Sequence, residues 1–120
     1  MRQPTSREIA LIQKLLEAGY AKGLPQVSEW EFAEIQPMNN DDTILRFRVS
    51  PGNRTLPGTA ENYIYVPVEA SALDDDGCII HVLLHLRGGK LYELEYLRER
   101  PGPIRQWPRA EDLFNFLVQN

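Results

Sequence analysis

The chain is poor in the residues that most often carry out chemistry. It has one cysteine, Cys78, and two histidines, His81 and His85, among 120 residues. A single cysteine forms no internal disulfide, so nothing in the sequence indicates an oxidising compartment. The N-terminal segment has no apolar signal core, and no run approaches the ~20 apolar residues that a membrane-spanning helix needs. We therefore expect a cytoplasmic protein without a membrane anchor.

Clusters of basic residues are missing as well. Lysine and arginine number 13 against 17 aspartates and glutamates, which gives a formal net charge of −4. Residues 1–60 contain seven basic and seven acidic residues, whereas residues 61–120 contain six and ten, so the second half carries the whole acidic excess. Nucleic-acid backbones are bound by clustered basic side chains. Direct nucleic-acid binding is therefore not expected, and the acidic half suits a basic protein partner.

Apolar residues are plentiful, at 42% of the chain, and a protein of this length buries roughly two thirds of its unfolded surface. We expect one domain spanning residues 1–120. Thr5 and Glu8 have capping-box spacing at the start of a helical pattern. Gly19 or Gly23 supplies a stop. The prediction is a helix over residues 6–21, with an apolar stripe at Ile9, Ile12, Leu15 and Leu16.

Several strands should follow this helix. An apolar segment around Trp30 and Ile35 is either a strand or a short irregular element, ended by Pro37. Residues 43–49 alternate between apolar and polar side chains, which is typical of a half-buried strand. Residues 50–61 are rich in proline and glycine, and a loop of this length indicates a role or mobility.

Residues 63–97 carry the clearest pattern, three strands joined by two short turns. A two-residue turn at Gly88-Gly89 would pair Leu84 with Glu93 and bury a carboxylate. A three-residue turn that includes Arg87 pairs Leu84 with Tyr92 instead. Because burying an unpaired carboxylate costs several kcal/mol, we predict the second register.

The same test applied to the turn at residues 75–77 pairs Ala70 with Val82 and Val68 with Leu84. Gly77 then stands third in the turn, where positive φ is needed. A final helix is expected after Pro108, with Leu113, Phe114, Phe116 and Leu117 on its apolar side. The predicted fold class is α+β, an antiparallel β-meander sheet covered on one face by the N-terminal helix, with a short C-terminal helix.

This register predicts that the other face of the sheet is acidic. Glu69, Leu83 and Glu93 should line up across the three strands, with His81 opposite Glu95 and His85 opposite Leu91. Arg46 and Arg48 on the neighbouring strand are placed to neutralise some of these carboxylates. The turn Asp74-Asp75-Asp76 should add three negative charges at one end of the sheet.

No metal or cofactor site is predicted. His81 and His85 lie about 13 Å apart if they share one face of a strand, too far for both to bind one ion. The Asp74–Asp76 turn lacks the alternating ligands and the distal glutamate of an EF-hand loop. An acid–base pair of His81 and Glu95 has no evident nucleophile or oxyanion donor beside it. Enzyme function is therefore not the first expectation.

Two stretches resemble an uncharacterised bacterial family of small proteins. They are the turn and strand Asp74-Asp75-Asp76-Gly77-Cys78-Ile79-Ile80 and the strand Gly89-Lys90-Leu91-Tyr92-Glu93-Leu94-Glu95. The start Thr5-Ser6-Arg7-Glu8 and the run Pro37-Met38-Asn39-Asn40-Asp41 are similar to that family too. Asp42-Thr43-Ile44 stands where the family would have a Gly-rich continuation, and Leu97-Arg98-Glu99 replaces an aromatic-Lys pair.

The resemblance implies an immunity protein, one that binds and neutralises a cognate bacterial toxin domain, as in contact-dependent growth inhibition. Many such toxins are nucleases with basic clefts, which an acidic inhibitor would meet favourably. The family supplies no catalytic residues. A monomer is favoured. The expected partner contacts are inferred only from charge and from the face of the sheet on which each residue lies. They are Glu69, Asp74, Asp75, Asp76, His81, Leu83, Glu93 and Glu95. The alternative is a small enzyme, or a ligand-binding or structural module, that uses the sheet face around His81 and Glu95.

Overall fold

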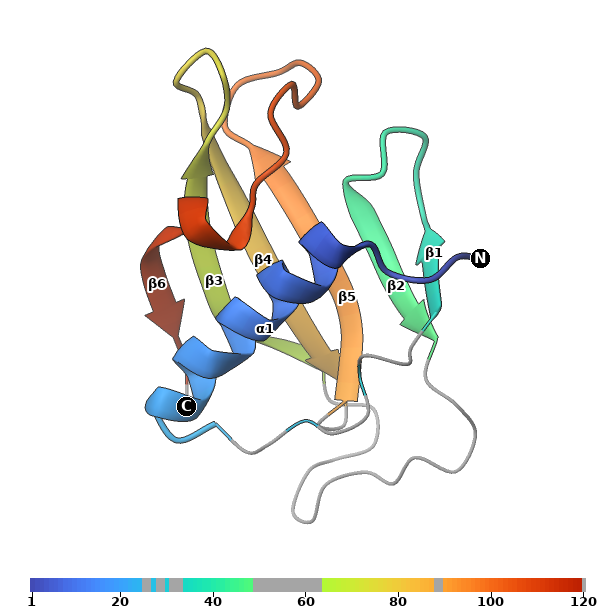
Figure 1. Ribbon diagram of the computed structural model, residues 1–120, viewed down its shortest axis with the longest axis vertical. Helices are drawn as coiled ribbons and strands as arrows, with labels where there is room; N and C mark the ends of the chain where they lie inside the picture. The colour runs from blue at the N-terminus through green and yellow to red at the C-terminus, as the bar shows by residue number, and fades with distance from the viewer. Residues whose placement is uncertain (25–26, 28–29, 31–33, 49–63, 88–89, 120) are drawn as a thin grey trace.

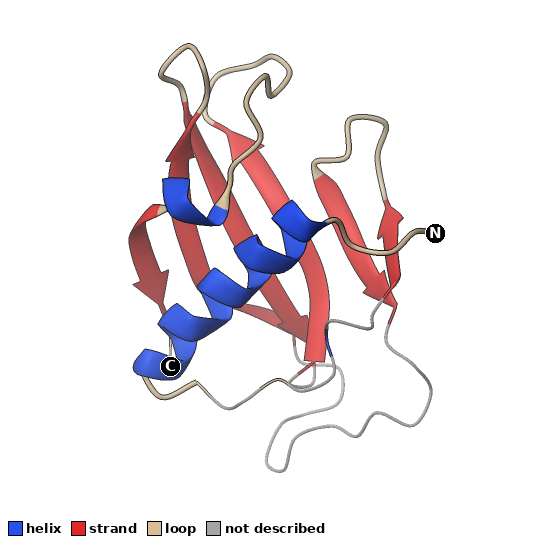
Figure 2. Ribbon diagram, in the orientation of Figure 1, coloured by secondary structure: helices blue, strands red, loops and turns tan. Residues whose placement is uncertain are grey.

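A six-stranded antiparallel sheet with one long helix across it forms the body of the protein (Figures 1 and 2). The computed structural model describes residues 1–24, 27, 30, 34–48, 64–87 and 90–119, with only the backbone described for 64–67. The strand order is β1-β2-β5-β4-β3-β6. The elements are α1 (Ser6–Ala21), β1 (Glu34–Pro37), β2 (Ile44–Arg48), β3 (Ile64–Leu73), β4 (Ile79–Arg87), β5 (Lys90–Arg98), the 3-10 turn η2 (Ala110–Asp112) and β6 (Phe114–Val118).

Helix α1 forms where the sequence predicts it. Thr5 accepts a hydrogen bond from the backbone N–H of Glu8, and the Glu8 carboxylate accepts one from the backbone N–H of Thr5, which completes the capping box. Gly23 has φ +97° and follows the C-terminal cap, so it is the stop. Gly19 instead lies inside the helix, where a Cβ atom would come within 3.0 Å of Val68. It lets α1 approach β3 closely.

The core lies between α1 and one face of the sheet. Leu11, Ile12, Leu15 and Leu16 of α1 are buried against alternate residues of the central strands, whereas Ile9 of the predicted stripe is only partly buried. Tyr96 closes one end, where its ring meets Trp107 edge-on at 5.0 Å between ring centroids. Arg7 lies over both rings and donates to the Pro108 carbonyl. The buried sheet residues are Ile35, Leu45, Phe47, Val68, Ala70, Ile80, Val82, Leu84, Leu86, Leu91, Leu94 and Tyr96.

The register between β3 and β4 is confirmed. Ala70 pairs with Val82 and Val68 with Leu84, and Gly77 has φ +82° in the connecting turn. The predicted half-buried strand is confirmed, because residues 44–48 form β2 and alternate in burial. Of the two alternatives left open for the segment around Trp30 and Ile35, residues 34–37 form a strand, β1. The predicted loop at residues 50–61 lies outside the described residues. No helix in the described part of the chain is both long and apolar enough to cross a membrane.

The predicted register between β4 and β5 is wrong by two residues. Arg87 pairs with Lys90, Leu84 pairs with Leu94, and the register shifts at Tyr92, which is an extra residue in β5. This β-bulge restores the alternation that a two-residue connection would otherwise have broken, so Glu93 stays out of the core. The turn residues 88 and 89 themselves lie outside the described residues. The prediction failed because it considered turn length and left out bulges.

The predicted C-terminal helix is also wrong. Only the short turn η2 forms after Pro108, and residues 114–118 form β6, which pairs with β3. Asn115 has φ +53° at the point where the β3–β6 register shifts, so β6 is itself bulged. Phe116 and Val118 pack against the core. Pairing with the free edge of β3 satisfies backbone groups that a helix would have left exposed.

Glu8 is a buried carboxylate whose interactions should contribute to stability. Burial alone raises its pKa, but hydrogen bonds from the Arg2 guanidinium and from Thr5 lower it on balance below the ordinary value. Both Glu8 oxygens accept hydrogen bonds from Arg2, at 2.7 and 2.8 Å. We expect Glu8→Gln to lower the free energy of unfolding at pH 7 by about 1–3 kcal/mol, measured by urea denaturation.

The pH dependence gives this prediction a sign. The pKa of Glu8 is lower in the folded state than in the unfolded state. Its contribution to the free energy of unfolding is therefore fully present above the unfolded-state pKa and is lost as the pH falls through the folded-state pKa. The gap between wild type and Glu8→Gln should therefore close in acid. Glu17→Gln, an exposed position on the same helix, is the matched control and should change little. A gap that widened in acid would contradict the assignment.

Candidate functional site

The sheet has two unlike faces, and the candidate site is the one opposite α1, called here the outer face. Both α1 and η2 lie on the same side of the sheet (Figure 1), and the described part of the chain places no helix on the outer face. Side chains at alternate positions of β2 to β6 point to it, because those between them are in the core. Most of the predicted contact residues lie here.

One row across the outer face is acidic at two positions and apolar between them. Glu69 pairs with Leu83, and Leu83 pairs with Glu95. The predicted row of Glu69, Leu83 and Glu93 is therefore corrected at its last member, because of the bulge at Tyr92. Leu117 of β6 continues the row beyond Glu69.

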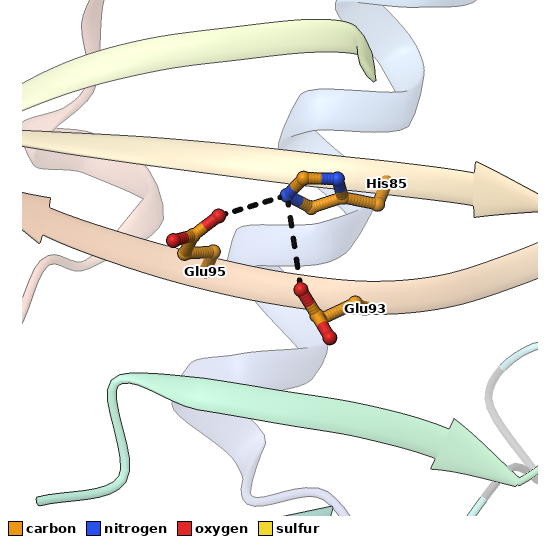
Figure 3. A group of neighbouring side chains, drawn as sticks. All are labelled: His85, Glu93 and Glu95. Carbon is orange, nitrogen blue, oxygen red and sulfur yellow. Dashed lines mark hydrogen bonds and ion pairs between the residues drawn. The ribbon is translucent and has the colours of Figure 1, made fainter. Parts of the chain in front are cut away.

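His85 lies between two carboxylates. Its partner across the β4–β5 ladder is Glu93, in place of the predicted Leu91. The Nε2 atom of His85 is 3.0 Å from Oε1 of Glu95 and 4.0 Å from Oε2 of Glu93. Figure 3 shows both carboxylates directed at this one nitrogen. All three side chains are largely shielded but reach solvent, with exposed fractions of 17%, 14% and 21% for His85, Glu93 and Glu95.

His81 has a different arrangement. It pairs with Leu97 rather than with the predicted Glu95. Its Nε2 atom is 2.8 Å from Glu99, while its Nδ1 atom is 3.8 Å from Glu69. The predicted acid–base pair of His81 and Glu95 is thus not formed. Sequence reasoning missed Glu99 because it ended the strand at Leu97, whereas the Glu99 N–H still donates to the Ile79 carbonyl.

The Asp74-Asp75-Asp76 turn is less of an open acidic patch than predicted. Asp74 is buried, and its carboxylate accepts hydrogen bonds from the backbone N–H groups of Asp75, Arg105 and Gln106. Burial by itself raises the pKa of Asp74, but these N–H groups and the nearby Arg98 charge lower it on balance. Asp74 therefore anchors the segment at 105–106 and is not available to a partner.

Asp76 is also engaged. Its carboxylate forms an ion pair with Arg98 and lies 3.9 Å from Arg100. The N–H of Cys78 is the main cause of a lowered pKa for Asp76, which burial opposes and the two guanidiniums strengthen. Asp75 is exposed, and its side chain forms no ion pair with another described residue. The negative charge of this turn is thus largely balanced.

The arginines of β2 mask one carboxylate of the outer face. Arg46 lies 3.1 Å from Oε1 of Glu93 and 4.8 Å from the centre of the Tyr92 ring. Arg48 instead contacts Met1. Within the described residues, the ion pairs of Glu69, Glu95 and Glu99 are made with histidines alone. The neutralisation by β2 arginines that the sequence suggested is therefore confirmed at Glu93, which pairs with Arg46. Glu69 and Glu95 pair with histidines and not with these arginines.

Large apolar side chains are exposed beside these carboxylates. Leu97 lies next to His81 on β5, and Phe114 and Leu117 reach the same face from β6. Leu73 and Leu117 are the most open, at 51% and 60% exposed. Sequence reasoning missed this patch because it placed residues 113–117 on a helix. The outer face thus combines unmasked carboxylates with apolar contacts.

Cys78, the single thiol, offers no accessible nucleophile. It is buried and 3.6 Å from the Ile79 carbonyl oxygen. Burial raises the pKa of its thiol, and hydrogen bonding to Arg100 together with the Arg98 charge lowers it on balance. Because the sulfur atom is enclosed, a substrate could not reach it without local opening. A structural role fits this position.

Taken together, the geometry defines a small α+β protein with one open, mixed acidic and apolar sheet face. The chain belongs to a family described as a domain of unknown function, DUF6984, whose model matches residues 1–108. No curated protein and no solved structure matches this chain.

Asp74 provides a direct test of the corrected role of the acidic turn. Asp74→Asn removes the charge that accepts three backbone N–H groups and lies near the Arg98 guanidinium, so we expect a melting temperature lower by several degrees in thermal unfolding. Asp75→Asn, the exposed neighbour, is the control and should melt like the wild type. Equal melting temperatures for all three proteins would show that Asp74 is not an anchor.

Proposed function

We propose that the outer face is a protein-binding surface, and that the protein is an immunity protein that neutralises a basic, nuclease-like toxin domain in the cytoplasm. One observation carries this proposal: unmasked carboxylates and large exposed apolar side chains share one open sheet face. Protein interfaces commonly combine an apolar centre with a polar rim. Here Leu83 and Leu97 would supply the centre, and Glu69 and Glu99 the rim.

Charge supports a basic partner. The second half of the chain carries the acidic excess, and Glu69, Glu95 and Glu99 are balanced only by histidines within the described residues. Complementary charge raises the association rate and selects against acidic partners. A toxin domain with a cationic cleft would be blocked if this face covered the cleft, without any chemistry by the inhibitor.

The alternative, a small enzyme or a ligand-binding or structural module around His81 and Glu95, receives less support. These two residues do not pair with each other, because His81 lies opposite Leu97 and Glu95 contacts His85. A structural module would use the exposed apolar residues to bind a second copy of the chain. The mass of the isolated protein in solution separates that possibility from a monomer awaiting another partner.

The proposal predicts a stable 1:1 complex with a toxin encoded by the neighbouring gene, measured by light scattering and calorimetry. The double variant Glu69→Lys with Glu99→Lys should weaken binding by roughly tenfold or more at low salt, mainly through slower association. Glu17→Lys, a charge reversal on an exposed position of α1, is the control. It should bind like the wild type.

Two results would contradict the proposal, the first its function and the second its choice of interface. One is a neighbouring gene product that is harmless and does not bind. The other is a complex whose affinity is unaffected by the double variant, since that would place the interface elsewhere. A self-associated dimer that survives the absence of any toxin would favour the structural module instead.

A further inference from the structure

The three side chains His85, Glu93 and Glu95 bring three potential metal ligands to one point. Their ligand atoms all lie within 4.8 Å of one another. The carboxylates come from β5 and the imidazole from β4, and both carboxylates approach the same atom, Nε2 of His85 (Figure 3). Their distances to it are 3.0 Å for Glu95 and 4.0 Å for Glu93.

These separations are close to those of atoms that share one metal ion. Nitrogen and oxygen ligands at ~2.1 Å from a metal, at tetrahedral or octahedral angles, lie about 3.0–3.4 Å apart. The Glu95 contact already matches this separation. The Glu93 carboxylate would need to move by less than about 1 Å, which rotation of its side chain can supply.

The other histidine shows why the convergence on one nitrogen matters. His81 also contacts two carboxylates, but Glu99 lies at Nε2 and Glu69 at Nδ1. These two nitrogens face opposite sides of the ring, so an ion at one of them could not be bound by both carboxylates. His81 therefore has the composition of a metal site without its geometry, and it serves as an internal control.

The acidic turn offers a second contrast. The Asp74, Asp75 and Asp76 carboxylates also lie within 4.8 Å of one another. The Asp74 oxygens, however, already accept three backbone N–H groups, and Asp76 is paired with Arg98. A cation there would have to displace these donors, so the turn is explained by the fold.

Arg46 orients the Glu93 carboxylate in the cluster of His85, Glu93 and Glu95. Its guanidinium binds Oε1 of Glu93, at 3.1 Å, and leaves Oε2 directed toward His85. Groups that hold a ligand from behind commonly fix its orientation in metal sites. The positive charge of Arg46 lowers the attraction for a cation, but two carboxylates still leave a net negative site.

We propose that His85, Glu93 and Glu95 form a binding site for a divalent transition metal ion. One imidazole and two carboxylates suit Zn²⁺, Mn²⁺ or Fe²⁺, whereas Mg²⁺ and Ca²⁺ favour all-oxygen sites. Three protein ligands leave at least one position for water or a further ligand. The partial exposure of the cluster gives an ion access from solvent.

The test uses the tag-free 120-residue protein, treated with a chelator and then titrated with Zn²⁺ by calorimetry and with Co²⁺ by visible absorption. We expect one equivalent to bind. His85→Ala and Glu95→Gln should each weaken binding by at least about tenfold, because each variant removes one of the three ligands. His81→Ala is the matched control and should bind as the wild type does. Circular dichroism confirms that each variant is folded.

Several outcomes would overturn the site. They are the absence of saturable 1:1 binding, equal losses in His81→Ala and His85→Ala, and full retention in Glu95→Gln. The metal site and the toxin interface can fail separately. The Glu69→Lys, Glu99→Lys double variant tests the interface and leaves all three metal ligands in place, so it should still bind one equivalent of metal if the site is as proposed.

Discussion

The pairing of β4 with β5 is the constraint on which the rest of the molecule depends. Both strands lie at the centre of the sheet, and their apolar side chains must meet α1 together. Leu84 and Leu94 are adjacent and fully buried, which requires the extra residue Tyr92 in β5. Without this bulge a carboxylate would enter the core, at a cost of several kcal/mol. The same bulge brings Glu93 opposite His85 and Glu95 opposite Leu83.

A second constraint acts at one end of the sheet. The buried carboxylate of Asp74 accepts backbone N–H groups from Arg105 and Gln106, and this holds the segment that follows β5 against the β3–β4 turn. Trp107 then packs on Tyr96, and β6 follows to pair with β3. A residue that looks like a surface charge in the sequence thus directs the end of the chain to the open edge of the sheet.

The two proposals concern neighbouring parts of the same face and use different residues. The toxin interface depends on Glu69, Glu99 and the exposed leucines, whereas the metal site depends on the cluster around His85. Glu95 lies at the boundary, next to Leu83 on one side and His85 on the other. A metal ion there would reduce the negative charge of the face. Occupancy of the metal site would therefore modulate a charge-dependent interface.

The sequence by itself determined the features that depend on neighbours along the chain. Helix α1 matches its predicted bounds because the capping box and the apolar stripe are local, and the β3–β4 register follows from a short turn between alternating strands. The α+β class follows from the same patterns, and so does the placement of Glu69, Glu93 and Glu95 on the face of the sheet away from the core. These predictions needed no knowledge of distant contacts.

Only the tertiary structure decided what depends on residues far apart in the chain. Packing of β4 and β5 against α1 favours the bulge at Tyr92, and this bulge sets the cross-strand partners of His81 and His85. The alternation of apolar and polar residues along the strands could not predict those partners. Residues 114–118 carry an apolar pattern that fits a helix, but the free edge of β3 makes them a strand. The burial of Asp74 depends on N–H groups 31 and 32 residues away. Local patterns leave each of these choices open, and long-range packing and hydrogen bonding settle them.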